Sequence, residues 1–313
     1  MQEVIYGCMG LGGSWSEEPH GTHHVEQAAA AVQAALDADI ILFDHADIYR
    51  SGKSEAVFGE VLAGTQGLRE RIRLQTKCGI RLNERGLQTH YDLSRDAILE
   101  RVNGSLERLR TDYVDILLLH RPDPLADPAE VGAAVGQLMA EGKVRQLGVS
   151  NMSAAQIEVL QDRLETPVVA NQLEMSLLKR AWLESQVLVN HPEHLDYSFP
   201  HGTLEYCTRN NITLQAYGSL ARGAYTGAEP ESPTSARAAT AELVAQLAGQ
   251  HGTSGEAVLL GWLMKHPAGI APVIGTANPD RIRACGDAAR VAVALTRADW
   301  YKLWVTARGS NIP

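Results

Sequence analysis

A chain of 313 residues, with 45% hydrophobic and 21% charged side chains, has the composition of an ordinary globular protein and enough apolar material for a large core. The formal net charge of −9 argues against nucleic acid or an anionic membrane as a partner, although it is compatible with one local basic pocket for a phosphate. The N-terminus shows no signal peptide and no apolar run is long enough to span a membrane, so we expect a cytoplasmic protein.

Short apolar segments that are typical of buried parallel strands recur along the chain. They lie at 4–6, 40–43, 72–77, 114–120, 145–149, 167–170, 212–216 and 270–274. Helical patterns alternate with them at 24–37, 55–62, 94–110, 236–250 and 256–265. Three further helices are expected: one that ends at Gly142, one that follows a capping box formed by Ser153 and Gln156, and one that begins at Asn278-Pro279. This alternation has no linker or low-complexity break. It predicts an α/β fold, a single (β/α)₈ barrel domain over residues 1–313.

Two connections are longer than such a barrel usually needs, at about 174–202 and 218–235. Long loops on the catalytic rim usually carry substrate or cofactor contacts. The second loop begins with small residues that allow a backbone to approach a phosphate chain, although a flexible surface loop has the same composition.

Three successive predicted strands end in polar residues. The first runs into Asp44, with Tyr49 shortly after it; the next two end at Lys77 and His120. Because the carboxyl ends of parallel strands meet at one rim, we expect these four side chains to lie together.

Their residue types suit proton transfer to a carbonyl. A tyrosine hydroxyl is a weak acid unless something stabilises its anion, which the ammonium of Lys77 would do, and a carboxylate such as Asp44 keeps that lysine charged and oriented. His120 could point a ring N–H at the oxygen of a bound carbonyl. Taken singly, Asp44 could be a loop cap, Lys77 a surface charge and His120 a core histidine. Their combination on successive strand ends indicates a reaction site.

Six motifs occur in the order, and at roughly the spacing, of the aldo-keto reductases. They are Gly-Cys-Met-Gly-Leu-Gly-Gly at 7–13, Phe-Asp-His-Ala-Asp-Ile-Tyr at 43–49, Thr-Lys-Cys-Gly at 76–79, Leu-Leu-His-Arg-Pro-Asp-Pro at 118–124, Gly-Val-Ser-Asn at 148–151 and Asn-Gln at 171–172. The chain resembles this family over essentially its whole length. It is most similar to a bacterial branch with the His-Ala-Asp-Ile-Tyr and His-Arg-Pro-Asp-Pro motifs.

The resemblance implies reduction of a small-molecule aldehyde or ketone with NADP(H), in which Tyr49 protonates the carbonyl oxygen as hydride arrives from the nicotinamide. Asp44, Tyr49, Lys77 and His120 match the catalytic tetrad. Ser150, Asn151 and Gln172 match the residues that hold the carboxamide of the nicotinamide, and Tyr217 matches the aromatic ring that stacks on the nicotinamide. Thr276 and Arg281 match the residues that hold the 2′-phosphate of NADP(H), and the fixed fork of donors of an arginine suits a phosphate. The cofactor-binding residues implied in this way are Gly7, Cys8, Met9, Ser150, Asn151, Gln172, Tyr217, Gly218, Ser219, Leu220, Gly223, Gly275, Thr276 and Arg281.

Some positions depart from the family pattern. Many relatives carry a lysine near Gly275, and Cys285 stands where an asparagine often contacts the adenine. We still expect NADP(H) rather than NAD(H). The chain starts almost at the first strand, so the hairpin that usually covers the barrel floor is expected to be absent or shortened. Met9 stands where the substrate pocket is often aromatic, which indicates a more open site.

Other kinds of site are disfavoured. His20, His23 and His24 lie in a polar segment without paired acid or cysteine spacing, so we expect no metal site there. No G-x-G-x-x-G motif follows the first strand, which argues against a Rossmann fold. The four cysteines are far apart, as buried thiols in a reducing cytosol would be.

Two other functional classes stay open. A lyase or aldolase could use Lys77 as a Schiff-base nucleophile, although that needs an unpaired lysine and Asp44 and Tyr49 argue against it. A regulatory protein could keep the fold and the cofactor with slow turnover. Because a barrel of this kind completes its own site, we expect a monomer.

Overall fold

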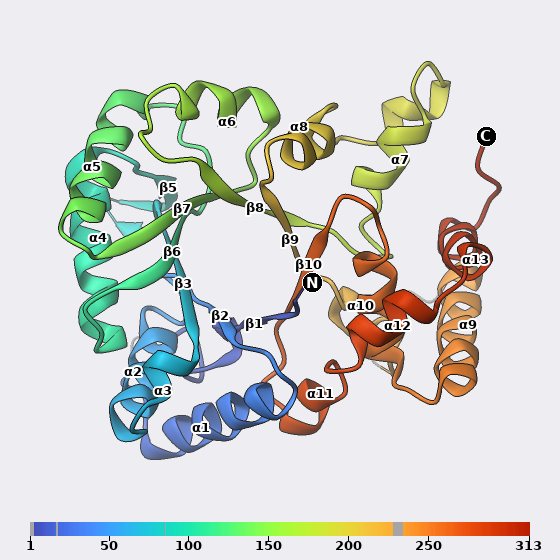
Figure 1. The fold of residues 1–313 in the computed structure, drawn as a ribbon, viewed down its shortest axis with the longest axis horizontal. Helices are drawn as coiled ribbons and strands as arrows, with labels where there is room; N and C mark the ends of the chain where they lie inside the picture. Colours follow the sequence, from blue (N-terminus) through green and yellow to red (C-terminus); the bar gives the residue numbers. More distant parts are fainter. Residues whose placement is uncertain (1–2, 17, 85, 228–233) are drawn as a thin grey trace. The chain divides into compact units, whose positions relative to one another are not determined.

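The structure is a computed structural model that describes residues 3–16, 18–84, 86–227 and 234–313. Its parallel strands form a closed barrel in the order β1-β10-β9-β8-β7-β6-β3-β2. They are β1 (Ile5–Gly7), β2 (Leu42–Asp44), β3 (Arg73–Cys78), β6 (Val114–Leu119), β7 (Val144–Ser150), β8 (Val168–Glu174), β9 (Thr213–Tyr217) and β10 (Ile270–Ile274) (Figure 1). The predicted (β/α)₈ barrel is therefore confirmed.

Helices alternate with these strands along the chain. They are α1 (Thr22–Asp37), α2 (Lys53–Gly64), α3 (Leu68–Arg71), α4 (Arg95–Leu109), α5 (Pro128–Ala140), α6 (Ala154–Gln161), α7 (Ala181–Val187), α8 (Thr203–Arg209), α9 (Ser235–His251), α10 (Gly255–Met264), α11 (Pro279–Arg283), α12 (Ala288–Ala294) and α13 (Arg297–Arg308). Among the residues that the structure describes, no helix is both long enough and apolar enough to cross a membrane.

Contacts between Cα atoms divide the chain into two compact units. The N-terminal unit contains Ile5–Gln172 with Gly275–Pro279, and the C-terminal unit contains Leu173–Ile274 and Asp280–Pro313 with Met1–Val4. The prediction of one domain over the whole chain stays a prediction.

The parallel register of the N-terminal unit aligns its strand ends. Asp44 pairs with Gly7 on one side and with Gln75 on the other, and Lys77 pairs with Leu118. The helices α1, α2, α4 and α5 lie outside these strands (Figure 1). Local signals act as predicted: Ser153 and Gln156 form a reciprocal capping box at the start of α6, and Gly142, just beyond α5, has a positive φ of 73°.

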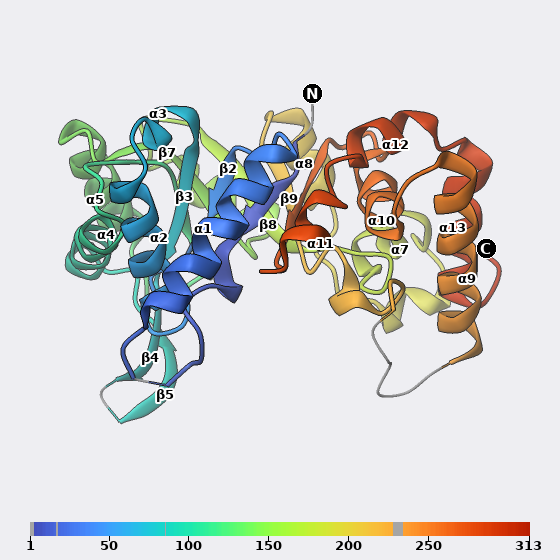
Figure 2. The ribbon, with the colours of Figure 1, turned by 90° about the horizontal axis from the view of Figure 1, so that it is seen from below.

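A two-stranded antiparallel hairpin, β4 (Ile80–Glu84) and β5 (Leu87–Tyr91), follows β3 directly and was not predicted. It begins at Ile80, just after the carboxyl end of β3, and projects beyond the strands of the same unit (Figure 2). β5 is mostly exposed, so it lacks the apolar alternation that marks a half-buried strand.

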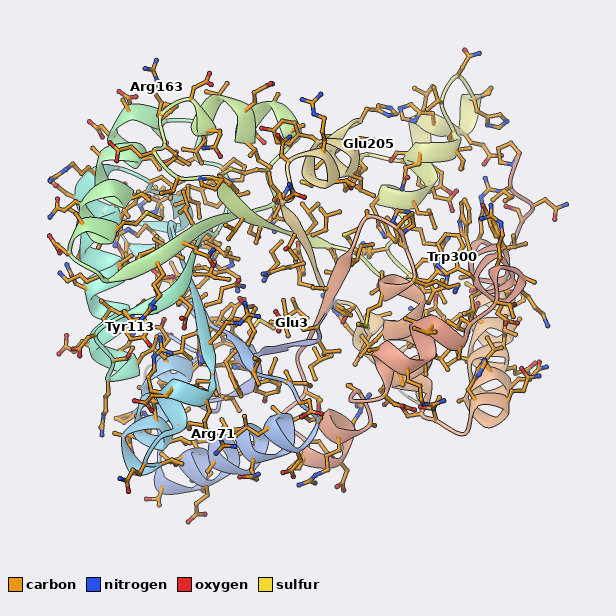
Figure 3. All side chains as sticks on the ribbon, viewed as in Figure 1. Glu3, Arg71, Tyr113, Arg163, Glu205 and Trp300 are labelled. Carbon is orange, nitrogen blue, oxygen red and sulfur yellow. The ribbon has the colours of Figure 1, made fainter. Side chains whose placement is uncertain are left out.

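The C-terminal unit is built on β9 and β10, which pair in parallel, and on the fully buried face of α10. Trp300 lies on α13 (Figure 3). It stacks on Trp262 of α10, and each indole N–H donates to the other residue's carbonyl oxygen, at 3.1 and 2.9 Å. These reciprocal bonds let two large aromatic side chains be buried without an unsatisfied donor.

The connection over 174–202 is long, as predicted, but it is not a structureless loop. It contains α7 and a short 3-10 helix, η2 (Pro192–Asp196). The fully buried carboxylate of Glu184 holds α7 in place, because it accepts from Trp304 Nε1 at 2.9 Å and from Arg308 Nε at 3.1 Å. The other predicted loop, 218–235, contains the 3-10 helix η3 (Ala221–Gly223), and its residues 228–233 lie outside the described part of the chain.

Candidate active site

An ion pair between neighbouring strands forms the centre of the site. Lys77 Nζ on β3 donates to Oδ1 and Oδ2 of Asp44 at the end of β2, at 2.7 Å each. The relative exposure of the two side chains is 0% and 3%. Gln75 Nε2 donates to Asp44 Oδ1 at 2.6 Å, so the carboxylate is fixed from two residues of β3. A buried ion pair with further hydrogen bonds has its charges compensated and its geometry fixed.

The turn after β2 brings Tyr49 to the same lysine. Lys77 Nζ lies 3.1 Å from Tyr49 Oη, and it also donates to the His45 carbonyl oxygen at 3.0 Å. Two backbone bonds attach the turn to β3, from His45 N to Gln75 O at 2.8 Å and from Asp47 N to Lys77 O at 3.0 Å. The position of the phenol therefore follows from the pairing of β2 with β3.

His120 follows β6 directly, and its backbone N–H donates to Cys78 O at 2.9 Å. Its ring meets the Tyr49 ring edge to face, with centroids 6.0 Å apart and an interplanar angle of 82°. The structure thus brings together all four residues of the predicted tetrad, within the N-terminal unit.

Burial and charge set the protonation states of these groups. Burial raises the pKa of Tyr49 above its ordinary value, and the nearby Lys77 ammonium lowers it only in part. Burial alone disfavours a charged lysine, but Asp44 and Tyr49 together raise the pKa of Lys77 above its ordinary value. Burial and the Lys77 charge hold the pKa of His120 well below its ordinary range. At neutral pH the site therefore contains a phenol, an ammonium and a neutral imidazole, and a protonated, ion-paired lysine is unsuited to Schiff-base chemistry.

Eight of the predicted cofactor residues lie in the N-terminal unit: Gly7, Cys8, Met9, Ser150, Asn151, Gln172, Gly275 and Thr276. Ser150 and Gln172 are paired in register at the ends of β7 and β8, where Ser150 Oγ donates to Gln172 O at 2.9 Å and accepts from Asn151 Nδ2 at 2.7 Å. These adjacent hydroxyl and amide groups are of the type that binds a carboxamide.

The turn after β1 lies beside the loop at 275. A Cβ on Gly10 would lie only 3.3 Å from the Gly275 carbonyl oxygen, so a larger residue would crowd this approach. Cys8 is completely buried, whereas Met9 is 49% exposed, so Met9 is the residue of this turn with an accessible side chain. Thr276 Oγ1 accepts from Asn278 N at 3.2 Å.

The other six predicted cofactor residues lie in the C-terminal unit: Tyr217, Gly218, Ser219, Leu220, Gly223 and Arg281. Tyr217 ends β9, and Gly218 and Gly223 have positive φ values of 66° and 80°. Ser219 Oγ donates to Val273 O at 2.7 Å, which ties the start of this loop to β10. Arg281 is half-exposed; its Nη2 lies 3.4 Å from Thr226 Oγ1 and its Nε 3.5 Å from Glu256 Oε1.

Several residues near the site were not predicted. Gln75 could have been found, because residues two apart in a strand point to the same face and Lys77 was already assigned there. A second set lies behind the tetrad: Asp47, Glu55, Thr76, Arg101 and Arg108. Its members come from four elements, the turn after β2, α2, β3 and α4, so no local pattern indicates their contacts.

An apolar cavity of about 350 Å³ lies beside the segment that follows His120, lined by residues that include Leu119, Pro122, Val131, Met152 and Leu160. None of the tetrad residues lines it, so it is separate from the reaction centre. Among the described residues, no group of three or more His, Cys, Asp or Glu side chains is placed to hold a metal ion. His20 instead bonds Glu60 at 2.9 Å. All four cysteines are buried free thiols.

Comparison with known proteins agrees with this architecture. The sequence model of the "Aldo/keto reductase family" matches residues 3–303. A "6-dehydroglucose reductase" of Agrobacterium fabrum is 34% identical over 100% of this chain and 96% of its own length. An uncharacterised oxidoreductase of Bacillus subtilis, YcsN, is 36% identical over 90% of this chain and 88% of its own.

An aldo-keto reductase from Klebsiella pneumoniae, solved "in complex with NADPH", has the same fold. Its TM-score is 0.71 at 21% identity, and the match covers 97% of this chain and 94% of that one. Because the family model spans nearly the whole chain and full-length relatives exceed 30% identity, the protein belongs to the aldo/keto reductase family of oxidoreductases.

Proposed function

We propose that this oxidoreductase reduces an aldehyde or ketone to the corresponding alcohol with NADPH, and that Tyr49 is the proton donor. The observation that carries the proposal is the position of Lys77 Nζ, 3.1 Å from Tyr49 Oη and 2.7 Å from both oxygens of Asp44. The bound cofactor supplies a hydride to the carbonyl carbon. Tyr49 transfers its hydroxyl proton to the carbonyl oxygen, so that one hydride and one proton make the alcohol.

Lys77 stabilises the phenolate that remains after the transfer. Its ammonium is kept charged by Asp44, and it already donates to Tyr49 Oη, so little rearrangement is needed as negative charge develops there. Neutral His120, whose ring lies against that of Tyr49, donates a ring N–H to the carbonyl oxygen and orients it.

The polar groups present suit a nicotinamide dinucleotide. We assign the carboxamide contacts to Ser150, Asn151 and Gln172, and the 2′-phosphate contact to Arg281 with Thr276. Support for NADP(H) over NAD(H) comes from Arg281, a half-exposed guanidinium that can form charge-assisted hydrogen bonds to a phosphate, and from the related fold solved with NADPH.

The substrate class is proposed from the relatives. Two of them, at 34% and 36% identity, are named 6-dehydroglucose reductase. A sugar with a terminal aldehyde is therefore the first carbonyl to test. We further propose that the protein acts in the cytoplasm as a monomeric, single-domain enzyme.

The test follows NADPH and NADH oxidation by purified protein with 6-dehydroglucose and a panel of activated aldehydes. Tyr49→Phe should lower the rate by about a hundredfold or more, because it removes the proton donor. Tyr91→Phe, the same change at an exposed tyrosine of β5, should leave the rate unchanged. Equal rates for wild type and Tyr49→Phe would refute the role of Tyr49. Tight NADPH binding by a wild type without turnover would favour the regulatory alternative.

A further inference from the structure

Asp47 is a buried carboxylate in the turn that carries Tyr49. It lies between Asp44 and Tyr49 in the sequence, and its backbone N–H donates to the Lys77 carbonyl oxygen at 3.0 Å. Its side chain has no exposed surface, and neither carboxylate oxygen accepts a hydrogen bond from another side chain. A buried carboxylate in this condition is costly, so a reason for its presence is to be expected at a functional site.

The groups that face Asp47 come from α2, α4 and β3. Arg101 and Arg108 lie roughly two helical turns apart on α4 and therefore on one face of it. Arg101 Nε lies 3.8 Å from Asp47 Oδ2, whereas Arg108 Nε donates to Glu55 Oε2 on α2 at 2.8 Å. Cys78 on β3 also lies close enough to interact electrostatically with Asp47.

These four charged residues, Asp47, Glu55, Arg101 and Arg108, form an ion cluster in which both carboxylates are buried and both arginines are partly exposed. Thr76 connects it to the tetrad: its Oγ1 donates to Glu55 Oε1 at 2.6 Å, and the next residue in β3 is Lys77. Because successive strand residues point to opposite faces, the cluster lies on one side of β3 and the Lys77 side chain on the other. The cluster therefore supports the tetrad from behind.

Within the cluster, Glu55 accepts hydrogen bonds from other side chains and Asp47 does not. Arg101 forms ion pairs with two carboxylates, Asp47 in the turn and Glu84 on β4 of the hairpin. Arg101 Nε itself has no hydrogen-bond partner. A small shift of the Arg101 side chain toward Asp47 would shorten the 3.8 Å contact to the length of a hydrogen bond.

The pKa of Asp47 lies near neutral pH, unlike the pKa values of Tyr49, Lys77 and His120. Burial and the nearby Glu55 raise the pKa of Asp47 to about 7, against the lowering effect of Arg101 and Arg108. In contrast, the pKa values of Tyr49 and Lys77 are raised from already high values, and that of His120 is well below its ordinary range.

We propose that Asp47 is a positioning residue for Tyr49: its ionised carboxylate holds Arg101 against the turn and so fixes the phenol, and its protonation releases this contact. The inference rests on the proposed carbonyl reduction for its kinetic consequences. A step in kcat near neutral pH then reports Asp47 rather than a tetrad residue, with the higher rate on the alkaline side.

The test compares wild type, Asp47→Asn and Asp96→Asn between pH 6 and 8. Asparagine keeps the shape of the side chain but cannot ionise, and Asp96 is an exposed residue of α4 that provides the same chemical change elsewhere. At pH 8, Asp47→Asn should lower kcat about tenfold to a hundredfold, because small displacements of a reacting group have effects of that size. KM and the NADPH dissociation constant should stay within about twofold of wild type.

Two measurements distinguish a positioning role of Asp47 from a merely structural one: the pH dependence of kcat and the unfolding midpoint of the variant. Asp47→Asn should lose the step in kcat near pH 7 and keep an unfolding midpoint at or above that of wild type, since a buried charge has been removed. Arg101→Lys, which retains the charge, should recover part of the activity that Arg101→Gln loses. A wild-type profile in Asp47→Asn would overturn the proposal. So would a joint fall in kcat, cofactor affinity and stability.

Hydrogen exchange of residues 45–52 separates this inference from the proposed function. If the wild type reduces no carbonyl, the proposed function fails, but the exchange experiment still decides the role of Asp47. Protection of the turn should rise between pH 6 and 8 in wild type relative to Asp47→Asn. Equal protection in the two proteins at both pH values would overturn the inference.

Discussion

Lys77 donates from Nζ to both carboxylate oxygens of Asp44, at 2.7 Å each, and neither side chain has appreciable exposure. The same ammonium lies 3.1 Å from Tyr49 Oη. One buried charge thus links the stability of the barrel strands to the proton donor, and both consequences can be measured.

Asp44→Asn should destabilise the protein by about 3–5 kcal/mol, because it leaves a buried ammonium without its counter-charge. Lys77→Met should have a cost of the same order, and the double variant should lose less than the sum of the two. Urea unfolding at pH 7 measures all three. The matched control is Glu141→Gln, which breaks a surface pair of the same 2.7 Å length with Lys143 and should have a much smaller effect. Strict additivity in the double variant would contradict the coupling.

Acid should destabilise the protein through its buried histidines. Burial, helped by the Lys77 charge, lowers the pKa of His45 to about 3, and burial lowers that of His266 to about 4. The unfolded chain binds these protons near pH 6.5, so the stabilisation is complete above that pH and is lost progressively as the pH falls toward 4.

Denaturant unfolding from pH 8 to 5 measures this loss as a falling free energy of unfolding. His266→Gln should flatten the curve, whereas the exposed His23→Gln should not. Asp47 acts in the opposite sense. The pKa of Asp47 is raised to about 7 in the folded protein, against about 3.9 in the unfolded chain. The stability that Asp47 contributes is therefore complete below about pH 3.9 and is lost as the pH rises through 7. An unchanged slope in His266→Gln would show that its ring is not kept neutral by burial.

Arg281→Ala should raise KM for NADPH about tenfold or more, with little effect on NADH, because it removes charge-assisted hydrogen bonds to the 2′-phosphate. Glu256 lies 3.5 Å from Arg281 and carries the same charge sign as that phosphate. Glu256→Gln should therefore lower KM for NADPH. Arg283→Ala removes a neighbouring half-exposed arginine, paired with Asp280, and provides the control. Equal effects of Arg281→Ala on the two cofactors would refute the assignment.

Glu184→Ala should destabilise the protein by about 3 kcal/mol or more, because Arg308 and Trp304 would lose a shared buried acceptor. Glu193 pairs with the same Arg308 but is 46% exposed, so Glu193→Ala should cost below about 1 kcal/mol. Urea unfolding of the two variants compares them directly. Similar losses would mean that the buried hydrogen bonds do not hold α7.

The polar residues at the carboxyl ends of the strands were the feature that the sequence predicted most directly. Asp44, Lys77 and His120 each follow an apolar run, and a parallel barrel brings such positions to one rim. Helix signals with a local cause, such as the Ser153–Gln156 capping box, were equally reliable because their partners are three residues apart. The hairpin β4–β5 and helix α7 were missed, since β5 is exposed and α7 is held by contacts with α13, far along the chain.

The sequence by itself determined the alternation of strands and helices, the family and the identity of the residues at the rim, because periodicity and motif order are local properties. Only the tertiary structure decided that Gln75 binds Asp44, that Arg101 of α4 faces Asp47 and that Glu256 lies beside Arg281. It also decided which side chains are buried, and burial is the largest cause of the pKa shifts of His45, Asp47 and His120. The physical reason is that desolvation and long-range charge contacts depend on which distant segments pack together, and a local pattern does not specify that packing.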